Sequence, residues 1–373
     1  MKQEVSKPMF FDHSTSNIRL RRLHRHFDFF IRLSSFTHFF AKRYIYLVIF
    51  VNILIFSSSN CFAQDTHLSM YYMAPLILNP ANTGNFNEQW RVAGNYRNQW
   101  SALGTSFQTA TVSYDRKFYV LEREFSGGLM AVYDNTGVNG INFNKFYASA
   151  GYGFQYKKHF INAGVQAGYV NGSTNNLIFD SYWDETTGEY NTSDASSESI
   201  SYLDVNVGFS WKKNFNIFTP EAGISLMHVN YPKPKFTTLG STEAYSMRPA
   251  FYVSVLTSLS DVYYVKPAIY HSTTHWASTS LIGSNGGKKV RGNSMVKEIF
   301  AGIYMRYGFL NNIDAVLLQA GTSLKKVDIA INYDLNVSSL REVSGYRGAF
   351  EIAFIYRRKA PPLNTYSIPC NRL

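Results

Sequence analysis

Two stretches of this sequence combine residue types that could bind a metal ion or a phosphate group. His271 and His275 are four residues apart, a spacing that places two imidazoles on one face of a helix, where they can hold zinc. The sequence around them predicts the end of a strand, and no glutamate follows His271. Residues 283–289, G-S-N-G-G-K-K, lack the spacing of a phosphate-binding loop. We therefore predict no metal site at the histidines and a flexible basic loop over residues 283–294.

The sequence contains no complete residue pattern for calcium binding or for hydrolysis. Asp180, Asp184, Glu185 and Glu189 supply oxygen ligands of the kind that calcium prefers, but they lack the spacing of an EF-hand. We favour a solvated acidic loop over residues 171–199. Serine and histidine are both present, yet no G-x-S-x-G motif or similar pattern ties one serine to one histidine. The sequence predicts no catalytic residue, no metal site and no bound cofactor.

Other carboxylates lie in stretches where polar and apolar residues alternate strictly. The clearest stretch is 327–337, V-D-I-A-I-N-Y-D-L-N-V. Successive side chains of a strand point to opposite faces, so one face is apolar and the other carries Asp328 and Asp334. Burying the polar face in an apolar core would leave carboxylates and amides unpaired, and exposing the apolar face to water is also unfavourable. Both faces have a favourable environment when the apolar face meets lipid and the polar face meets a wet lumen, as in a transmembrane β-barrel.

The same alternation repeats along the chain and predicts an all-β fold, a transmembrane antiparallel barrel of about 14 strands. The candidate strands are 90–100, 108–114, 127–133, 145–156, 161–169, 203–211, 217–229, 247–257, 263–270, 276–282, 298–307, 313–324, 327–337 and 348–357. An even number is typical of single-chain outer-membrane barrels. Asp204, Asp328, Asp334 and Glu351 fall on the lumen side. They could line a conducting pore or pair with other polar side chains that fill the lumen, and we favour filling.

Composition agrees with a barrel and argues against other classes of protein. Aromatic residues make up 16% of the sequence and charged residues also 16%, whereas about a quarter of a soluble protein is charged. The formal net charge is +11, but residues 1–63 hold nine of the basic and three of the acidic residues. Without them the net charge is +5. A basic excess that largely disappears with the leader is poor evidence for nucleic acid, which we do not expect as a partner.

The end of the 63-residue leader, from Lys42 to Ala63, resembles an export signal, and residues 1–41 form a long basic stretch before it. Lys42 and Arg43 precede the short apolar run 44–56, and a C-F-A sequence ends at Ala63. We expect cleavage after Ala63, which would leave Cys370 as the sole cysteine and exclude an intrachain disulfide.

The predicted organisation has four parts. These are an extended leader with a signal peptide (1–63), an N-terminal extended segment (64–86), the outer-membrane barrel (87–358) and a C-terminal tail (359–373). Two X-Pro steps, Ala74-Pro75 and Asn79-Pro80, argue against a regular helix or central strand in the second part. That segment could lie in the periplasm or in the lumen.

A set of motifs in the mature chain resembles the PorP/SprF family of the Bacteroidetes type IX secretion and gliding system. The matching residues are Gln64, Tyr71, Tyr72, Pro75, Asn79, Pro80, Ala81 and Gly84, then Tyr96, Arg97, Asn98, Gln99 and Trp100. Later matches are His228, Pro232, Tyr333, Asp334, Ser338, Leu340 and the run Gly348-Ala349-Phe350-Glu351. The family often ends Cys-Pro-Arg-Phe, and this chain keeps Cys370 and Arg372 but lacks the proline and the final aromatic residue. The resemblance covers residues 64–373.

The resemblance implies a non-enzymatic, integral outer-membrane component of the type IX secretion and gliding machinery. Such a protein would anchor a large surface adhesin, or help to export it, by binding its C-terminal domain. Its implied partners are outer-membrane lipid, the adhesin and periplasmic secretion-ring components, and the motif residues would bind a partner or support the structure. A porin-like outer-membrane channel is the alternative. A lumen plugged by the N-terminal segment favours the anchor, and a wide, charged lumen favours the channel.

Overall fold

The computed structural model describes residues 66–358 with short gaps. The gaps are residues 102–105, 121–122, 136–140, 179–181, 185–188, 192–194, 234–243, 275–276, 293, 309–311 and 340. The leader with its expected cleavage site and the C-terminal tail with Cys370 and Arg372 lie outside the described residues.

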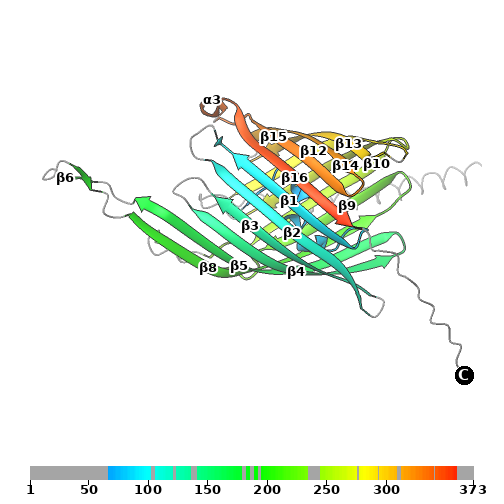
Figure 1. The fold of residues 1–373 in the computed structure, drawn as a ribbon, viewed down its shortest axis with the longest axis horizontal. Coiled ribbons are helices and arrows are strands. Elements are labelled where there is room, and N and C mark those ends of the chain that lie inside the picture. Colours follow the sequence, from blue (N-terminus) through cyan, green and yellow to red (C-terminus); the bar gives the residue numbers. More distant parts are fainter. Residues whose placement is uncertain are drawn as a thin grey trace, which may run out of the picture. The chain divides into compact units, whose positions relative to one another are not determined.

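Fourteen antiparallel strands close into one barrel in the described chain (Figure 1). The strands are β1 (Trp90–Gln99), β2 (Phe107–Val120), β3 (Arg123–Asn135), β4 (Asn142–Tyr156), β5 (His159–Ile178), β8 (Ala195–Lys213), β9 (Phe218–Met227), β10 (Arg248–Ser258), β11 (Tyr263–Thr273), β12 (Ser278–Lys289), β13 (Val296–Tyr307), β14 (Ile313–Leu324), β15 (Val327–Asn336) and β16 (Arg347–Arg358). Each strand pairs with the next, and β1 closes the barrel by pairing with β16 along its full length. The predicted barrel of about 14 strands is confirmed.

The prediction of two long loops, over residues 171–199 and 283–294, is partly wrong. β5 runs to Ile178 and β8 starts at Ala195, and the short strands β6 (Tyr182–Asp184) and β7 (Glu189–Asn191) pair with each other between them. The expected basic loop starts inside β12, which continues to Lys289. Its glycines and serines are weak strand formers, but pairing with β11 and β13 on both sides holds the segment in the sheet.

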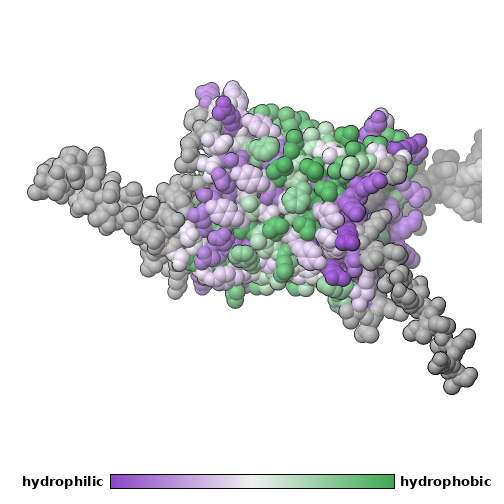
Figure 2. Space-filling model, viewed as in Figure 1, coloured by the Kyte–Doolittle hydropathy of each residue, from purple (hydrophilic) through white to green (hydrophobic). Residues whose placement is uncertain are grey.

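The two faces of the wall differ as the alternation predicts. On β15, Ile329, Ile331 and Tyr333 face outward and are 38–48% exposed, whereas Asn332 and Asp334 face the lumen and are at most 1% exposed. Figure 2 shows the result on one side of the barrel, where hydrophobic side chains form a band between two hydrophilic ends. An apolar band with polar ends is the surface that a membrane requires.

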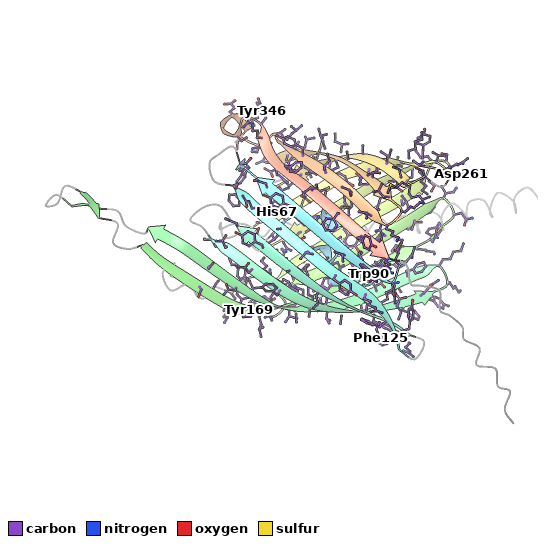
Figure 3. All side chains as sticks on the ribbon, viewed as in Figure 1. His67, Trp90, Phe125, Tyr169, Asp261 and Tyr346 are labelled. Carbon is purple, nitrogen blue, oxygen red and sulfur yellow. The ribbon has the colours of Figure 1, made fainter. Side chains whose placement is uncertain are left out.

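The two ends of the barrel differ in the length of their connections. At the end where β1 starts and β16 finishes, the turns are short, such as Lys157–Lys158 and residues 325–326. At the opposite end, residues 228–247 and 337–346 form longer connections. We call these the short-turn end and the long-loop end. In Figure 3, Trp90, Phe125 and Asp261 mark the short-turn end, and Tyr169 and Tyr346 mark the long-loop end.

The helices of the described chain are short. The segment before β1 contains η1 (Tyr71–Met73), α2 (Pro75–Leu78) and η2 (Pro80–Asn82), and α3 (Arg341–Ser344) lies in the long-loop connection before β16. The prediction of an extended N-terminal segment is therefore wrong, because each proline starts a helical turn instead of preventing one. No described helix is long and apolar enough to cross a membrane.

Candidate functional site

Residues 66–84 lie inside the barrel, and we call them the plug. η1 lies against β1 and β16, while η2 lies against β4, β5 and β8. The side chains of Met70, Leu76 and Ala81 are fully buried in the lumen. The plug thus lies in the lumen and contacts separate parts of the wall.

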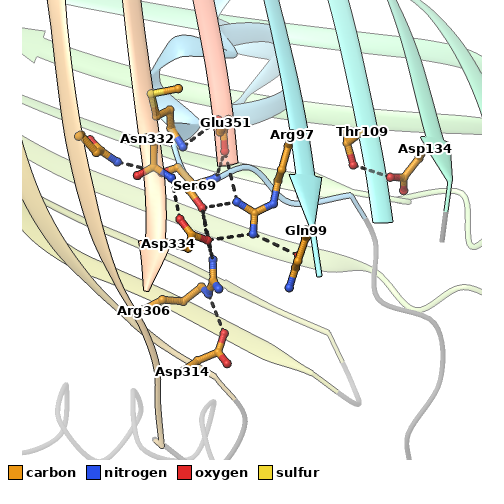
Figure 4. A network of polar contacts seen from close by, with 12 residues as sticks. Ser69, Arg97, Gln99, Thr109, Asp134, Arg306, Asp314, Asn332, Asp334 and Glu351 are labelled. Atoms are coloured by element: carbon orange, nitrogen blue, oxygen red, sulfur yellow. Dashed lines mark hydrogen bonds and ion pairs between the residues drawn. The ribbon is translucent and has the colours of Figure 1, made fainter. Parts of the chain in front are cut away.

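The first part of the plug meets a cluster of buried charges on β1, β13, β15 and β16 (Figure 4). The Asp334 carboxylate lies 3.0 Å from the Arg97 guanidinium and 2.6 Å from the Arg306 guanidinium. Glu351 lies 3.4 Å from Arg97, and Arg306 also contacts Asp314, at 2.7 Å. Buried charges are tolerated when opposite charges and hydrogen bonds compensate them, as they do here.

The same cluster binds the plug backbone. Glu351 accepts hydrogen bonds from the backbone N–H groups of Ser69 (2.8 Å) and Met70 (3.0 Å). The Ser69 hydroxyl donates to Asp334 at 2.9 Å and accepts a hydrogen bond from Arg97 at 2.5 Å. Two carboxylates and two guanidinium groups of the wall are therefore organised around one residue of the plug.

His67 stands next to this cluster. Burial, reinforced by the positive charges of Arg97 and Arg306, lowers the pKa of His67 to about 3. The imidazole is therefore neutral at pH 7 and adds no further positive charge beside the two arginines.

The later part of the plug is held by close packing. The Asn79 side chain donates hydrogen bonds to the carbonyl oxygens of Phe209 (3.0 Å) and Ile224 (3.1 Å) in the wall. A Cβ atom on Gly208 would lie 1.9 Å from the Asn79 side-chain oxygen, and one on Gly164 would lie 2.2 Å from the Pro80 carbonyl oxygen. The asparagine-proline turn reaches the wall only because both wall positions are glycine.

The plug ends on a third set of contacts. The Gly84 N–H donates to Asp115 at 2.8 Å, and Asp115 also forms a buried ion pair with Arg91 at 2.6 Å. The Ser126 hydroxyl donates to the Thr83 carbonyl oxygen at 2.7 Å. These contacts join the last plug residues to β1, β2 and β3, beside the short-turn end.

Among the described residues, cavities lie on the short-turn side of the plug. A cavity of about 1230 Å³ there is lined by Lys117, Lys212 and Arg357, and a second one, of about 380 Å³, is lined by Tyr264 and Glu298. Towards the long-loop end, two further cavities measure about 20 and 40 Å³. The plug therefore leaves a sizeable cavity beside the short-turn end.

His228, another motif residue, lies where β9 ends at the long-loop side. Its ring nitrogen Nδ1 is 2.8 Å from the Asp204 carboxylate, which also accepts a hydrogen bond from the Tyr147 hydroxyl at 2.8 Å. The His228 backbone N–H donates to Asn206 at 2.9 Å, and its φ of 58° is unusual for a residue other than glycine. These contacts fix the start of the 228–247 connection to β8.

The remaining motif residues divide between the lumen and the outer surface. Tyr71 stacks on Tyr270, and the Tyr72 hydroxyl donates to Gln319 at 2.9 Å, so both tyrosines belong to the plug contacts. Gln99 accepts a hydrogen bond from Arg97. Tyr96, by contrast, faces outward, and Trp100 packs edge-on against Phe107 at the end of β1.

Several plug contacts were not expected from the sequence. Arg306, Ser69, Asp115, Gly164 and Gly208 all contact the plug or its charge cluster. Arg306 had a detectable signal, because it occupies a lumen-facing position of an alternating strand. Gly164 and Gly208 had no such signal in the sequence, because the need for glycine at these positions depends on the path of the plug.

The described residues give little support for metal binding by the histidine pair or by the acidic residues of the loops. The His271 ring nitrogen Nδ1 contacts the Ser280 hydroxyl at 2.8 Å, while His275 lies outside the description. Asp180 and Glu185 also lie outside it, as do the side chains of Asp184 and Glu189. Within the described ranges no three His, Cys, Asp or Glu side chains gather in a metal-binding arrangement.

A closed antiparallel barrel with an apolar outer band and an internal plug defines an integral outer-membrane β-barrel protein. Residues 60–356 match the family described as type IX secretion system membrane protein PorP/SprF, and the chain belongs to this family. The resemblance found in its motifs is thereby confirmed. No curated protein matches the sequence significantly.

Solved structures resemble this chain over about three quarters of its length at low sequence identity. The Ralstonia pickettii toluene transporter TbuX has 11% identity and a TM-score of 0.46, covering 77% of this chain and 94% of its own. The Pseudomonas putida toluene transporter TodX has 10% identity and a TM-score of 0.46, covering 77% and 93%. A Pseudomonas aeruginosa FadL homologue has 11% identity and a TM-score of 0.42, covering 75% and 92%. These likenesses concern the fold alone.

Proposed function

We propose that this protein is a non-enzymatic anchor of the type IX secretion and gliding machinery. It holds a large surface adhesin at the outer membrane, or assists its export, by binding the adhesin's C-terminal domain. The observation that carries the proposal is the plugged lumen. Family membership supplies the secretion context, and the plug favours binding at the ends of the barrel over conduction through it.

The contacts between the plug and the wall support a plug that stays permanently in the lumen. Ser69 and Met70 contribute backbone N–H groups to Glu351, and removing them would leave a buried carboxylate with Arg97 as its remaining partner. Asn79 and Pro80 fill hollows beside two wall glycines. Withdrawal of the plug would break both sets of contacts, so an open pore is unfavourable.

The difference between the two ends supports an orientation in the membrane. Outer-membrane barrels have short periplasmic turns and longer extracellular loops. In that orientation the long-loop end faces the cell exterior and offers its connections to the adhesin domain. The short-turn end, with its cavity of about 1230 Å³, is then accessible to periplasmic secretion-ring components.

The proposal is tested by recovering partners of the full-length tagged protein from detergent-solubilised outer membranes after mild crosslinking. We expect mass spectrometry to identify a large secreted protein crosslinked through its C-terminal domain. His228→Ala, which loosens the start of the 228–247 connection, should reduce this recovery. Asp261→Ala is the matched control, because Asp261 lies in an exposed turn at the opposite end.

Normal heat-modifiable migration of both variants would show that they fold. Recovery of no secreted protein, together with steady conductance of the wild type in planar bilayers, would contradict the anchor and support a porin-like channel.

A further inference from the structure

The short-turn end carries a set of basic side chains on the outer face of the barrel. Arg116 lies on the same face of β2 as Tyr114 and Phe118, which are 40% and 46% exposed. Lys213 and Lys288 hold the corresponding outward positions on β8 and β12, and Lys157 lies in the turn between β4 and β5. We call Arg116, Lys157, Lys213 and Lys288 the basic rim.

Each cation of the basic rim lies over an aromatic ring. Arg116 is 5.6 Å from the centroid of Phe118, and Lys157 is 5.3 Å from that of Tyr156. The other two pairs are Lys213 over Phe215 at 4.7 Å and Lys288 over Tyr263 at 5.8 Å. These distances are typical of cation–π contacts. Because aromatic girdles of barrels lie at the membrane interface, the four positive charges lie at the level of the lipid headgroups.

Three described carboxylates at this end pair with cations outside the rim. Lys117 pairs with Glu124, Arg357 with Asp328, and Arg291 with Asp261. None of the four rim cations forms an ion pair with a carboxylate among the residues that the structure describes. Their positive charges therefore face the headgroup region without a described counter-charge from the protein.

We propose that the basic rim binds the phosphate groups of anionic lipids in the membrane leaflet at the short-turn end. The rim residues sit on β2, the β4–β5 turn, β8 and β12, which span nine neighbouring strands of the closed barrel, from β12 to β2. A single docked protein would have to cover more than half of the barrel's circumference to reach all four, and a free phosphate ion would need donors that converge on one point. Lipids surround the barrel on all sides, and lysine and arginine bind phosphate oxygens through charge-assisted hydrogen bonds.

The test measures which lipids the purified full-length protein retains. The protein is equilibrated with mixed micelles containing equal amounts of phosphatidylglycerol and phosphatidylcholine, and native mass spectrometry counts the bound lipids. We expect several-fold enrichment of phosphatidylglycerol on the wild type. The variant R116Q/K157Q/K213Q/K288Q should return to an equal ratio. The matched control is K233Q/R341Q/R347Q, which removes three charges near the long-loop end and should keep the enrichment.

A second measurement needs no variant and remains decisive if the fourfold substitution fails to fold. Enrichment on the wild type should fall as sodium chloride rises from 50 to 500 mM, because salt screens the attraction to headgroups.

Four results would overturn the proposal. These are equal binding of the two lipids by the wild type, enrichment that does not respond to salt, enrichment kept by the folded rim variant, and complete loss of enrichment on adding 10 mM inorganic phosphate. If the rim variant keeps its lipids but loses a soluble acidic protein that copurifies with the wild type, the rim is a protein-docking surface instead.

Discussion

The two parts of the plug are held in the barrel by different physical means. Around Ser69, charged side chains of four strands converge on the plug and bind the Ser69 hydroxyl or the plug backbone. Around Asn79 and Pro80, the wall contributes carbonyl oxygens and the missing side chains of two glycines. We call these the ion-paired part and the close-packed part.

The difference shows how a polar lumen can be filled without an apolar core. The ion-paired part depends on complete compensation, because one missing charge leaves another buried and unpaired. The close-packed part depends on shape, because the plug backbone touches the wall backbone where a single methyl group would intrude. The ion-paired part should therefore be sensitive to loss of charge, and the close-packed part to added volume.

Removal of Asp334 should have the largest effect. Asp334→Ala leaves Arg97 and Arg306 without their shared carboxylate inside the lumen. We expect a loss of about 3–5 kcal/mol of stability, measured as a lower temperature for the heat-modifiable shift on electrophoresis. The control is Asp261→Ala, which removes an exposed ion pair worth about 1 kcal/mol or less. Equal shifts in the two variants would contradict the importance of the buried cluster.

The addition of one methyl group to the close-packed part should cause the second-largest loss of stability. Gly164→Ala places a Cβ against the Pro80 carbonyl oxygen, and backbone atoms can yield only if the plug moves. Overpacking of this kind costs about 1–3 kcal/mol and should expose plug residues to added protease. Gly286→Ala is the matched control, because its Cβ would meet one backbone oxygen at 4.0 Å. Identical cleavage of both variants would contradict the close approach.

Substitutions at Asn79 and Gly208 should show energetic coupling, with a smaller effect than the two changes above. Asn79→Ala removes two hydrogen bonds to wall carbonyls, with an expected loss of about 1–2 kcal/mol. Gly208→Ala should be costly in the wild type, where its Cβ meets the Asn79 oxygen. In the Asn79→Ala background the cost should fall, and a double-mutant cycle measures the difference. Strict additivity would show that a Cβ at position 208 does not meet the Asn79 side chain.

Loss of the Ser69 hydroxyl should have the smallest effect. Ser69→Ala removes the hydrogen bonds to Asp334 and Arg97 but keeps the backbone donors to Glu351. We expect a loss of about 1 kcal/mol in the same electrophoretic assay. A loss as large as that of Asp334→Ala would mean that the hydroxyl, and not charge compensation, organises the cluster.

Strand positions and faces could be predicted from the sequence because alternation is a local signal. The alternation places Ile331 and Asp334 on opposite faces, as the structure confirms, since lipid and lumen impose opposite preferences on neighbouring residues. For residues 64–86 the sequence predicts an extended segment and does not distinguish a place in the periplasm from one in the lumen. Their helical turns and their path depend on Glu351, Gly164 and other residues far along the chain. Contacts of that range leave no periodic trace in a single sequence.

The most direct test of a lumen closed by its plug is conductance in planar lipid bilayers. Purified wild-type protein should insert without steady conductance, and the Asp334→Ala/Gly164→Ala variant, which disturbs both parts of the plug, should show discrete channel openings. Steady openings of the wild type, equal in size and frequency to those of the double variant, would contradict a closed lumen.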